Sequence, residues 1–595
     1  MSKRPSSRSD ERPPTILPGG LLQLVRRYRI PALFCAFAVL LCELISRPFA
    51  AMGICDDWSY TRSAQDLLST GHIVYNGWAM PFQGWQLYLG AAFIKLFGFS
   101  FTAVRMSTLL VAMALAFLLQ RTLVRSGITE RNATLATLAF VLSPLYLMLS
   151  ATFMNDIHGT FAIVICLYGC LRALQASTSR ATIAWLVFAV AANALFGSAR
   201  QISWLGILVM LPSTLWLLRA RRAVLLSGAA ATLAGVLFIF GCLQWFKRQP
   251  YSVPDQLIPN TLPIAHTLAQ VFHTLLDIPF LLLPIIALFF PRIRRSRPRI
   301  LVGLAAVSLA YLLLALHWRH THPDFLLEPT LGDWLGIHGI YEVTELKGTP
   351  PIFLTPLARV LLTVLSIGGL LGLLASLLQH HTPPTTAPAP NTRIPWLQLN
   401  TLLLPFTFAS AFLIFAHSAM FVINDRYLLA LVFVALLYLV RYYQQAIHPR
   451  LPLATLALIA LMATYGIAIT HNLFSLYRAR VALAAEIHST GVPYTSVDNG
   501  WEYNMTVELQ HSNHINNILI DNPAHAHLPV PPLPSTTCPM NHFDLTPHIH
   551  PLFRVSFDPN ACYGPAPFAP VHYSRWLSHS PGTLYAVRYT PPSKP

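Results

Sequence analysis

Two adjacent carboxylates stand just after the first long apolar stretch of the chain. Asp56 and Asp57 follow the apolar block 30–48 and open a helix-like segment, 57–69. A carboxylate at this place could act as a general base, which takes a proton from a reacting hydroxyl. It could equally cap the segment, because negative charge complements the N-terminus of a helix. The residues alone leave both interpretations open.

Two further charged residues stand at short turns between apolar blocks. Asp156 is the only acid in its turn, and Arg200 is the only cation in another. Asp156 could be a second carboxylate of the same site or the cap of helix 157–175. Arg200 could bind a phosphate through its bidentate guanidinium, or it could simply reach the membrane interface. If these residues serve one reaction, their turns must meet in the fold.

The composition indicates which elements position these residues. Of the 595 residues, 54% are hydrophobic and only 11% are charged, whereas a soluble domain carries about 25% charged residues. This excludes a soluble globular protein, a disordered protein and a coiled coil. The apolar residues form blocks long enough to cross a bilayer, so we predict an α-helical polytopic membrane protein. Thirteen spans are expected, near 30–48, 101–120, 132–150, 157–175, 182–198, 202–218, 223–245, 268–290, 300–316, 352–378, 397–418, 427–443 and 452–470.

The net charge of +17 follows this topology. With the N-terminus in the cytoplasm, the cytoplasmic segments hold 23 of the 40 Lys and Arg residues but only three of the 23 acids. This is the positive-inside pattern, so a nucleic-acid partner is not expected. The short apolar stretch 83–98 would reverse the pattern if it were a span. We therefore predict an interfacial amphipathic helix there, on the outer surface.

The spans divide the chain into three parts. We expect a disordered basic cytoplasmic arm, a transmembrane domain with two large outer loops, and a small extracytoplasmic α/β domain, at 1–29, 30–470 (loops 49–100 and 317–351) and 471–595. The last part contains a strand-like piece, 583–589, and two cysteines, Cys538 and Cys562. In an oxidising compartment these cysteines are a plausible disulfide.

Most of the charged residues on the outer side stand at the ends of helices. An ion-coupled carrier is expected to place charges near the middle of the membrane, where ionisable groups are costly and functional. Here the cytoplasmic side is nearly free of acids, and the acids gather instead at the outer rim of the predicted bundle. This distribution favours a reaction at the outer interface on a lipid-borne substrate.

The order of these motifs resembles that of the GT-C membrane glycosyltransferases that use polyprenyl-phosphate sugars. Within that superfamily it is most similar to the protein O-mannosyltransferase group and the bacterial lipid A aminoarabinose transferases. The motifs are the pair Asp56-Asp57, the stretch 96–100 (LFGFS), Ala103-Val104-Arg105, Ser143-Pro144 and Phe153-Met154-Asn155-Asp156. They lie within about residues 30–220, and the helix count with an outer C-terminal domain extends the resemblance across the chain.

The resemblance implies a thirteen-helix GT-C fold and transfer of a sugar from a polyprenyl-phosphate donor to an acceptor hydroxyl. It implies a catalytic carboxylate in the first outer loop, Asp56 or Asp57, with a slight preference for Asp57, and a second one, Asp156. The leaving phosphate needs cations, and the candidates, in order, are Arg200, Arg62 and Arg319. The acceptor would be a lipid, a glycan or a protein, and the membrane a bacterial inner membrane with the C-terminal domain in the periplasm.

The resemblance raises the possibility of one cofactor, a divalent metal ion. Some relatives carry Glu-Lys-Pro near the second interfacial helix and bind a metal through the Glu, but the matching stretch here, 79–83, lacks both charges. His266 lies where such relatives can place a metal-binding histidine, and its other interpretation is an ordinary interfacial histidine. No metal site is therefore assigned.

Two other classes of function remain open. A transporter or flippase of lipid-linked saccharides would show inverted repeats or broken helices near mid-membrane, and the chain has no clear internal repeat. A non-catalytic assembly or sensor protein would use the C-terminal part as a binding module. Release of polyprenyl phosphate would separate an enzyme from both.

Overall fold

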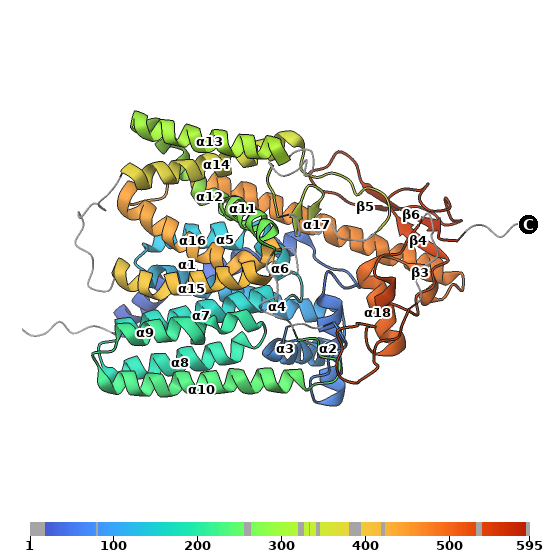
Figure 1. The fold of residues 1–595 in the computed structure, drawn as a ribbon, viewed down its shortest axis with the longest axis horizontal. Coiled ribbons are helices and arrows are strands. Elements are labelled where there is room, and N and C mark those ends of the chain that lie inside the picture. The colour runs from blue at the N-terminus through green and yellow to red at the C-terminus, as the bar shows by residue number, and fades with distance from the viewer. Residues whose placement is uncertain are drawn as a thin grey trace, which may run out of the picture.

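Long helices make up most of the chain. The structure, a computed structural model, describes residues 18–78, 81–254, 263–318, 327–331, 334–340, 346–379, 394–417, 423–530 and 538–590. The long helices run side by side as a bundle, and the C-terminal elements gather at one end of it (Figure 1). The chain is an integral multi-pass membrane protein by the length and apolar character of these helices.

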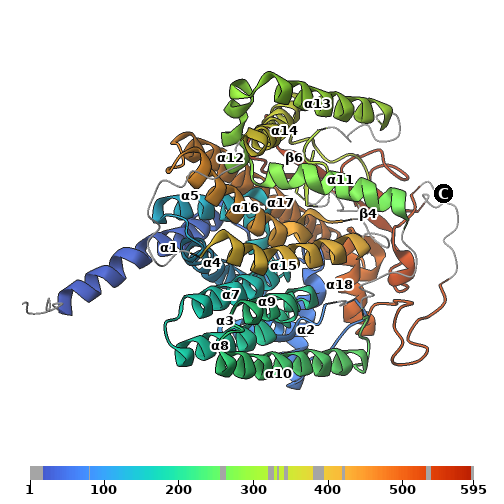
Figure 2. The same cartoon turned by 60° about the vertical axis from the view of Figure 1, so that its left-hand side comes forward.

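Ten helical segments are long and apolar enough to cross a membrane. They are α1 (Pro18–Ser46), α4 (Phe101–Arg125), α7 (Asp156–Gln175), α8 (Ser179–Gly197), α10 (Arg222–Lys247), α13 (Pro298–Trp318), α14 (Pro356–Gln379), α15 (Trp396–His417), the run η4 (Asp425–Leu428), α16 (Leu429–Tyr442) and η5 (Tyr443–Ile447), and α17 (Ala454–Ser489). The helix α1 begins inside the predicted arm 1–29, and its first turns project from the bundle (Figure 2). Residues 1–17 of that arm lie outside the described residues.

Two more predicted spans are sharply bent. The first pair is α5 (Glu130–Val141) and α6 (Pro144–Ser150), bent by 69°, and the second is α11 (Ile264–Leu281) with α12 (Leu283–Ile286) and η3 (Ala287–Arg295), bent by 74°. A proline stands at each break, Pro144 and Pro284, and a proline removes a backbone donor that a continuous helix needs.

The predicted span 202–218 is a shorter apolar stretch, Gln201–Leu217. It is divided into η1 (Gln201–Trp204), η2 (Gly206–Met210) and α9 (Leu211–Leu217). The described residues thus hold ten spans, or twelve if each bent pair is one span, and the predicted number of thirteen is not confirmed.

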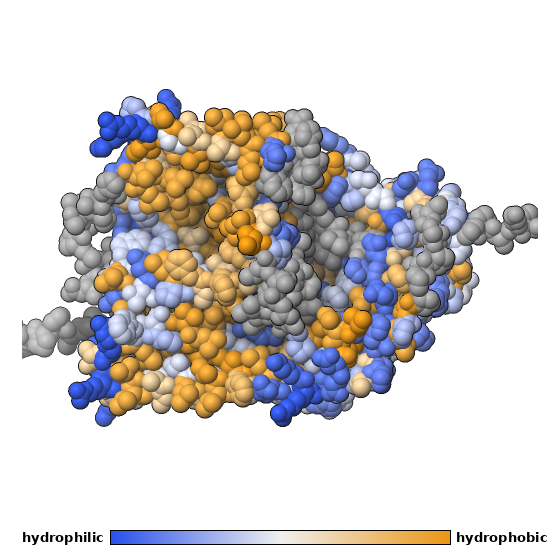
Figure 3. All heavy atoms as spheres, viewed as in Figure 1, coloured by the Kyte–Doolittle hydropathy of each residue, from blue (hydrophilic) through white to orange (hydrophobic). Residues whose placement is uncertain are grey.

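The helix α7 is the most enclosed of the spans. It packs against α4 and α8, and 72% of its apolar window is buried, compared with 11% for α13. A helix held on several sides places its first residues firmly, and Asp156 is the first residue of α7. Exposed apolar side chains cover much of the outside of the bundle, as a lipid-facing surface requires (Figure 3).

The first loop contains two short helices, α2 (Asp57–Thr70) and α3 (Gly84–Phe97). With 14 residues, α3 is too short to cross a bilayer. It buries Leu87 and Ile94, whereas Tyr88 and Leu96 are exposed. One face packs inward and the other is open, as expected of the predicted interfacial helix.

The C-terminal part begins on α17, whose 36 residues continue beyond the membrane-spanning length. It then forms η6 (Tyr494–Ser496), β3 (Val497–Asp498), α18 (Trp501–Ser512), η7 (Phe543–Leu545), β4 (Phe553–Ser556), β5 (Val571–Tyr573) and β6 (Gly582–Arg588). The sheet order is β3-β4-β6-β5, with β3 and β4 parallel and the other pairs antiparallel. The predicted strand at 583–589 corresponds to β6. A second sheet pairs β1 (Leu335–Gly336) with β2 (Gly339–Ile340).

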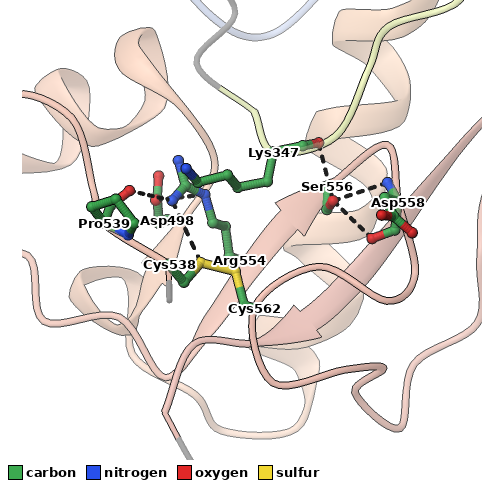
Figure 4. The surroundings of a disulfide bond; sticks show 8 residues. All are labelled: Lys347, Asp498, Cys538, Pro539, Arg554, Ser556, Asp558 and Cys562. Atoms are coloured by element: carbon green, nitrogen blue, oxygen red, sulfur yellow. Dashed lines mark hydrogen bonds and ion pairs between the residues drawn. A yellow bond between two sulfur atoms is a disulfide. The ribbon is translucent and has the colours of Figure 1, made fainter. Parts of the chain in front are cut away.

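The expected disulfide is present in this part. Cys538 and Cys562 are bonded, with their Cα atoms 4.9 Å apart. Figure 4 shows the bond beside Arg554, whose Nη1 donates to the Pro539 carbonyl at 2.9 Å and whose Nε lies 3.1 Å from Asp498. The disulfide therefore joins two loops against the centre of the sheet.

Candidate functional site

A cavity of about 450 Å³ opens where the first loop meets the bundle. Its walls come from the first loop, the start of α7, the turn at η1, the end of α10, the end of α15 and the start of α16. Its charged lining residues are Asp56, Asp156, Arg200, Lys247 and Arg426. Turns that are far apart in the sequence thus contribute opposite charges to one cavity.

Asp56 is the first-loop carboxylate that lines this cavity. It is the N-cap residue of α2, yet its side chain makes no cap hydrogen bond. Its Oδ1 accepts a hydrogen bond from the Trp78 indole N–H at 3.0 Å, and its Oδ2 lies 3.5 Å from Nη2 of Arg426. The helix-cap interpretation therefore does not describe this side chain, which faces the cavity instead.

Asp57 is fully buried and does not line the cavity. Its two oxygens accept from Arg105, with Nε at 2.8 Å and Nη2 at 3.2 Å, and from the backbone N–H groups of Ile54 and Phe153, at 2.6 and 3.3 Å. The geometry does not support the slight sequence-based preference for Asp57 over Asp56. This carboxylate is fully engaged in joining the first loop to α4 and to the turn before α7.

Asp156 lines the same cavity as Asp56, and its side chain is 1% exposed. Its Oδ1 accepts from Nη1 of Arg200, and its Oδ2 lies 3.9 Å from Nη1 of Arg426. Oδ2 has no hydrogen-bond partner among the described residues. A carboxylate held between two guanidiniums can keep both of them in place for a ligand.

Arg426 and Lys247 are charged lining residues that the sequence analysis missed, and Arg426 is the one that contacts the carboxylates. It follows Asp425 in η4, at the start of a predicted span, and its guanidinium contacts both Asp56 and Asp156. It also lies over the rings of Tyr427 and Trp334, 5.3 and 5.8 Å from their centroids. The available signal was a charged pair next to an apolar block at the same rim as Arg200.

Arg200 precedes η1, and its guanidinium lies 4.6 Å from the centre of the Tyr427 ring. Gly159 on α7 provides the room for it, because a Cβ there would lie 2.7 Å from the Ser203 Oγ and 3.3 Å from the Arg200 Cβ. The Ser203 Oγ is buried, lines the cavity and has no hydrogen-bond partner among the described residues. It could donate a hydrogen bond to a ligand bound beside Arg200.

Tyr60 adds a hydroxyl to the same wall. Burial, together with the negative charge of Asp56, raises the pKa of Tyr60 well above its ordinary value, although the positive charge of Arg426 opposes this shift. The phenol therefore stays protonated near neutral pH. Apolar side chains complete the lining on α10 and α15, namely Leu243, Phe246, Leu413 and Ile414.

The remaining sequence candidates lie elsewhere. Arg62 pairs with Asp66 at 3.0 Å on the surface of α2 and does not line the cavity. Arg319 lies outside the described residues. His266 is exposed near the start of α11, also away from the cavity. Within the described ranges, no three His, Cys, Asp or Glu side chains are grouped as metal ligands.

Comparison with known proteins finds solved membrane-protein structures. No protein-family model and no curated protein sequence matches the chain. ArnT from Cupriavidus metallidurans bound to undecaprenyl phosphate is 13% identical, with a TM-score of 0.40, over 95% of this chain and 98% of that one. An Archaeoglobus fulgidus oligosaccharyltransferase complex with Zn and sulfate is 16% identical, with a TM-score of 0.38, over 86% and 62% of the two chains.

The Saccharomyces cerevisiae protein O-mannosyltransferase complex Pmt1-Pmt2, bound to the sugar donor, also matches. It is 16% identical with a TM-score of 0.31, and the match covers 37% of this chain and 33% of that one. Such scores, all below 0.5, do not assign a function, which has to come from the cavity itself.

Proposed function

We propose that the protein is a membrane glycosyltransferase that moves a sugar from a polyprenyl-phosphate donor to an acceptor hydroxyl at the outer face of the membrane. One observation carries the proposal: Asp56 and Asp156 share Arg426 in a cavity that Arg200 also lines. Two cations beside an available carboxylate suit a reaction that takes a proton and releases a phosphate.

The donor phosphate would lie between Arg200 and Arg426, where Asp156 holds both guanidiniums. The prenyl chain would follow the apolar side chains of α10 and α15, such as Phe246 and Leu413. The Ser203 hydroxyl, buried and unpartnered among the described residues, would donate to a phosphate or sugar oxygen.

In the reaction, the acceptor oxygen forms a bond to the anomeric carbon while the bond from that carbon to the phosphate oxygen breaks. Asp56 takes the hydroxyl proton, and both electrons of the broken bond leave with the polyprenyl phosphate. The two arginines stabilise the charge of the departing phosphate. The hydrogen bond from Trp78 keeps the Asp56 carboxylate directed into the cavity.

The test is sugar transfer by the purified full-length protein in liposomes containing undecaprenyl-phosphate hexose or pentose, with released polyprenyl phosphate as the readout. Because a positioned base contributes roughly 10²–10⁴-fold, we expect Asp56→Asn and Arg426→Ala to lose at least about a hundred-fold. Asp66→Asn is the matched control, since Asp66 lies on α2 but outside the cavity. Full activity of Asp56→Asn and Arg426→Ala at normal yield would refute the assignment.

The same assay separates the other classes of function. A flippase would move the lipid-linked sugar across the bilayer without releasing polyprenyl phosphate. A flippase would use broken helices to line its substrate site. The two bent helix pairs are broken in this way, but no residue of α5, α6, α11 or α12 is among the described residues that line the cavity. Repeating the transfer assay with a chelator tests whether a divalent metal ion takes part.

A further inference from the structure

We infer that the C-terminal helix α18 completes the catalytic site, with Trp501 and Glu502 as positioning residues for Asp56. The inference rests on the proposed role of Asp56 as the base. The helix packs against α2, which Asp56 precedes, although the two helices are far apart in the sequence (Figure 1). Two routes of contact lead from the first turn of α18 to Asp56.

The first route holds the backbone directly before Asp56. Cys55 has a φ of 52°, in the left-handed region that a residue with a Cβ seldom adopts. Such a conformation persists only where its surroundings hold it. The Cys55 N–H donates to Oε1 of Glu502 at 3.4 Å, so the C-terminal part contributes an acceptor to this strained turn.

Glu502 is itself firmly fixed. It is fully buried, and its Oε1 also accepts from the hydroxyl of Tyr477. Its Oε2 accepts from Nη2 of Arg480 at 3.0 Å. Both partners lie on α17, so the carboxylate that holds Cys55 is anchored to the helix that connects the membrane part to the C-terminal part.

The second route holds the side chain of Asp56. The ring of Trp501 lies edge-on to Trp78 with centroids 4.8 Å apart, and Trp58 packs against both. Trp78 donates its indole N–H to Oδ1 of Asp56. Neighbouring residues of α18 thus act on the backbone before Asp56 and on its carboxylate, which is the reason to assign α18 to the active site.

The first experiment compares Trp78→Phe with Trp58→Phe in the transfer assay. Both changes replace an indole by a smaller phenyl ring in the same aromatic cluster. Trp78 loses its hydrogen bond to Asp56, whereas Trp58 Nε1 has no hydrogen-bond partner among the described residues. We expect Trp78→Phe to lower kcat at least about ten-fold with little change in the KM for the donor. The acidic limb of its pH–rate profile should move up by about one pH unit, because the carboxylate loses a donor. Trp58→Phe removes no hydrogen bond to Asp56, so its kcat and its acidic limb should change much less than those of Trp78→Phe.

The second experiment is hydrogen exchange of the full-length protein over residues 50–62, which does not depend on activity. In Glu502→Gln the amide oxygen should face Arg480, so that its NH₂ group meets the Cys55 N–H. Exchange around Cys55 should then become several-fold faster. The control is Glu508→Gln, a buried acid of the same helix that accepts from Ser512 and His548, both of which belong to the C-terminal part.

The outcomes separate the two proposals. If the wild type transfers sugar and Asp56→Asn does not, but Trp78→Phe and Glu502→Gln behave like their controls, the positioning role of α18 is refuted and the function stands. If the wild type transfers no sugar, the proposed function fails, and the exchange data still show whether α18 holds the turn. Unchanged exchange in Glu502→Gln would reject that contact in either case.

Discussion

Exchange of Asp57 for Asn should unfold the first loop, whereas the same exchange at Asp56 should leave the fold intact and abolish transfer. Asp57 and Arg105 are 0% and 3% exposed and are joined by two contacts, at 2.8 and 3.2 Å. Arg105 also donates to the carbonyls of Ala50 and Met52, at 3.2 and 2.7 Å. Because removal of one partner leaves a buried charge uncompensated, Asp57→Asn should cost about 3–5 kcal/mol.

Asp56→Asn should cost roughly 1 kcal/mol or less, because the side chain is partly exposed and Asn keeps an acceptor for the Trp78 indole. The assay is thermal unfolding of the detergent-purified variants, with transfer measured on the same samples. Removing the charge of Arg105 as well, in Asp57→Asn/Arg105→Gln, should recover part of the loss, because the two residues are coupled. If Asp57→Asn melts with the wild type, the structural assignment of Asp57 is refuted. The assignment of Asp56 is refuted if Asp56→Asn transfers sugar normally.

Three further changes test other parts of the structure. Burial raises the pKa of Glu328 from 4.5 to about 8, although a hydrogen bond with the Thr330 backbone and the charge of Arg359 oppose this shift. The free energy of unfolding should therefore fall as pH rises from 4.5 to 8. The melting temperature of Glu328→Gln should lie above that of the wild type at pH 8 and close to it at pH 4.5. Equal melting temperatures of the two proteins at both pH values would contradict this. Replacing Cys538 and Cys562 by Ala should destabilise the C-terminal part by about 3–4 kcal/mol and lower its melting temperature. If reductant leaves the melting temperature of the wild type unchanged, the disulfide does not provide this stability. Gly159→Ala should reduce kcat/KM roughly ten- to hundred-fold by displacing the Ser203 hydroxyl and crowding the Arg200 side chain, and wild-type kinetics would show that this wall tolerates movement.

The positions of the spans and of the rim could be predicted because they depend on local composition. A run of apolar residues must lie in the membrane wherever the rest of the chain goes, and alternation of the spans puts the turns at Asp56, Asp156 and Arg200 at one end of the bundle. The bends at Pro144 and Pro284 were harder to predict from the sequence, because a bent helix and a straight one have the same apolar composition.

The roles of individual side chains depended on distant residues. Asp56 and Asp57 are neighbours of one type, and only the position of Arg105 on α4 determines which of them is buried in an ion pair. Arg426 adjoins Asp425, and the pair has the appearance of an ordinary charged helix start. The backbone N–H groups of Trp334 and Leu335 bind the Asp425 carboxylate, and Arg426 is directed into the cavity. No pattern within the local sequence contains that information.

The length of α17 has a consequence for any attempt to re-engineer the protein. Its 36 residues form one uninterrupted helix, about 54 Å long at 1.5 Å per residue, whereas the hydrocarbon core measures about 30 Å. Adding a single residue between the membrane part and Tyr477 would rotate everything beyond it by about 100°. Chimeras that exchange C-terminal parts between related proteins must therefore preserve the helical phase as well as the sequence on either side of the junction.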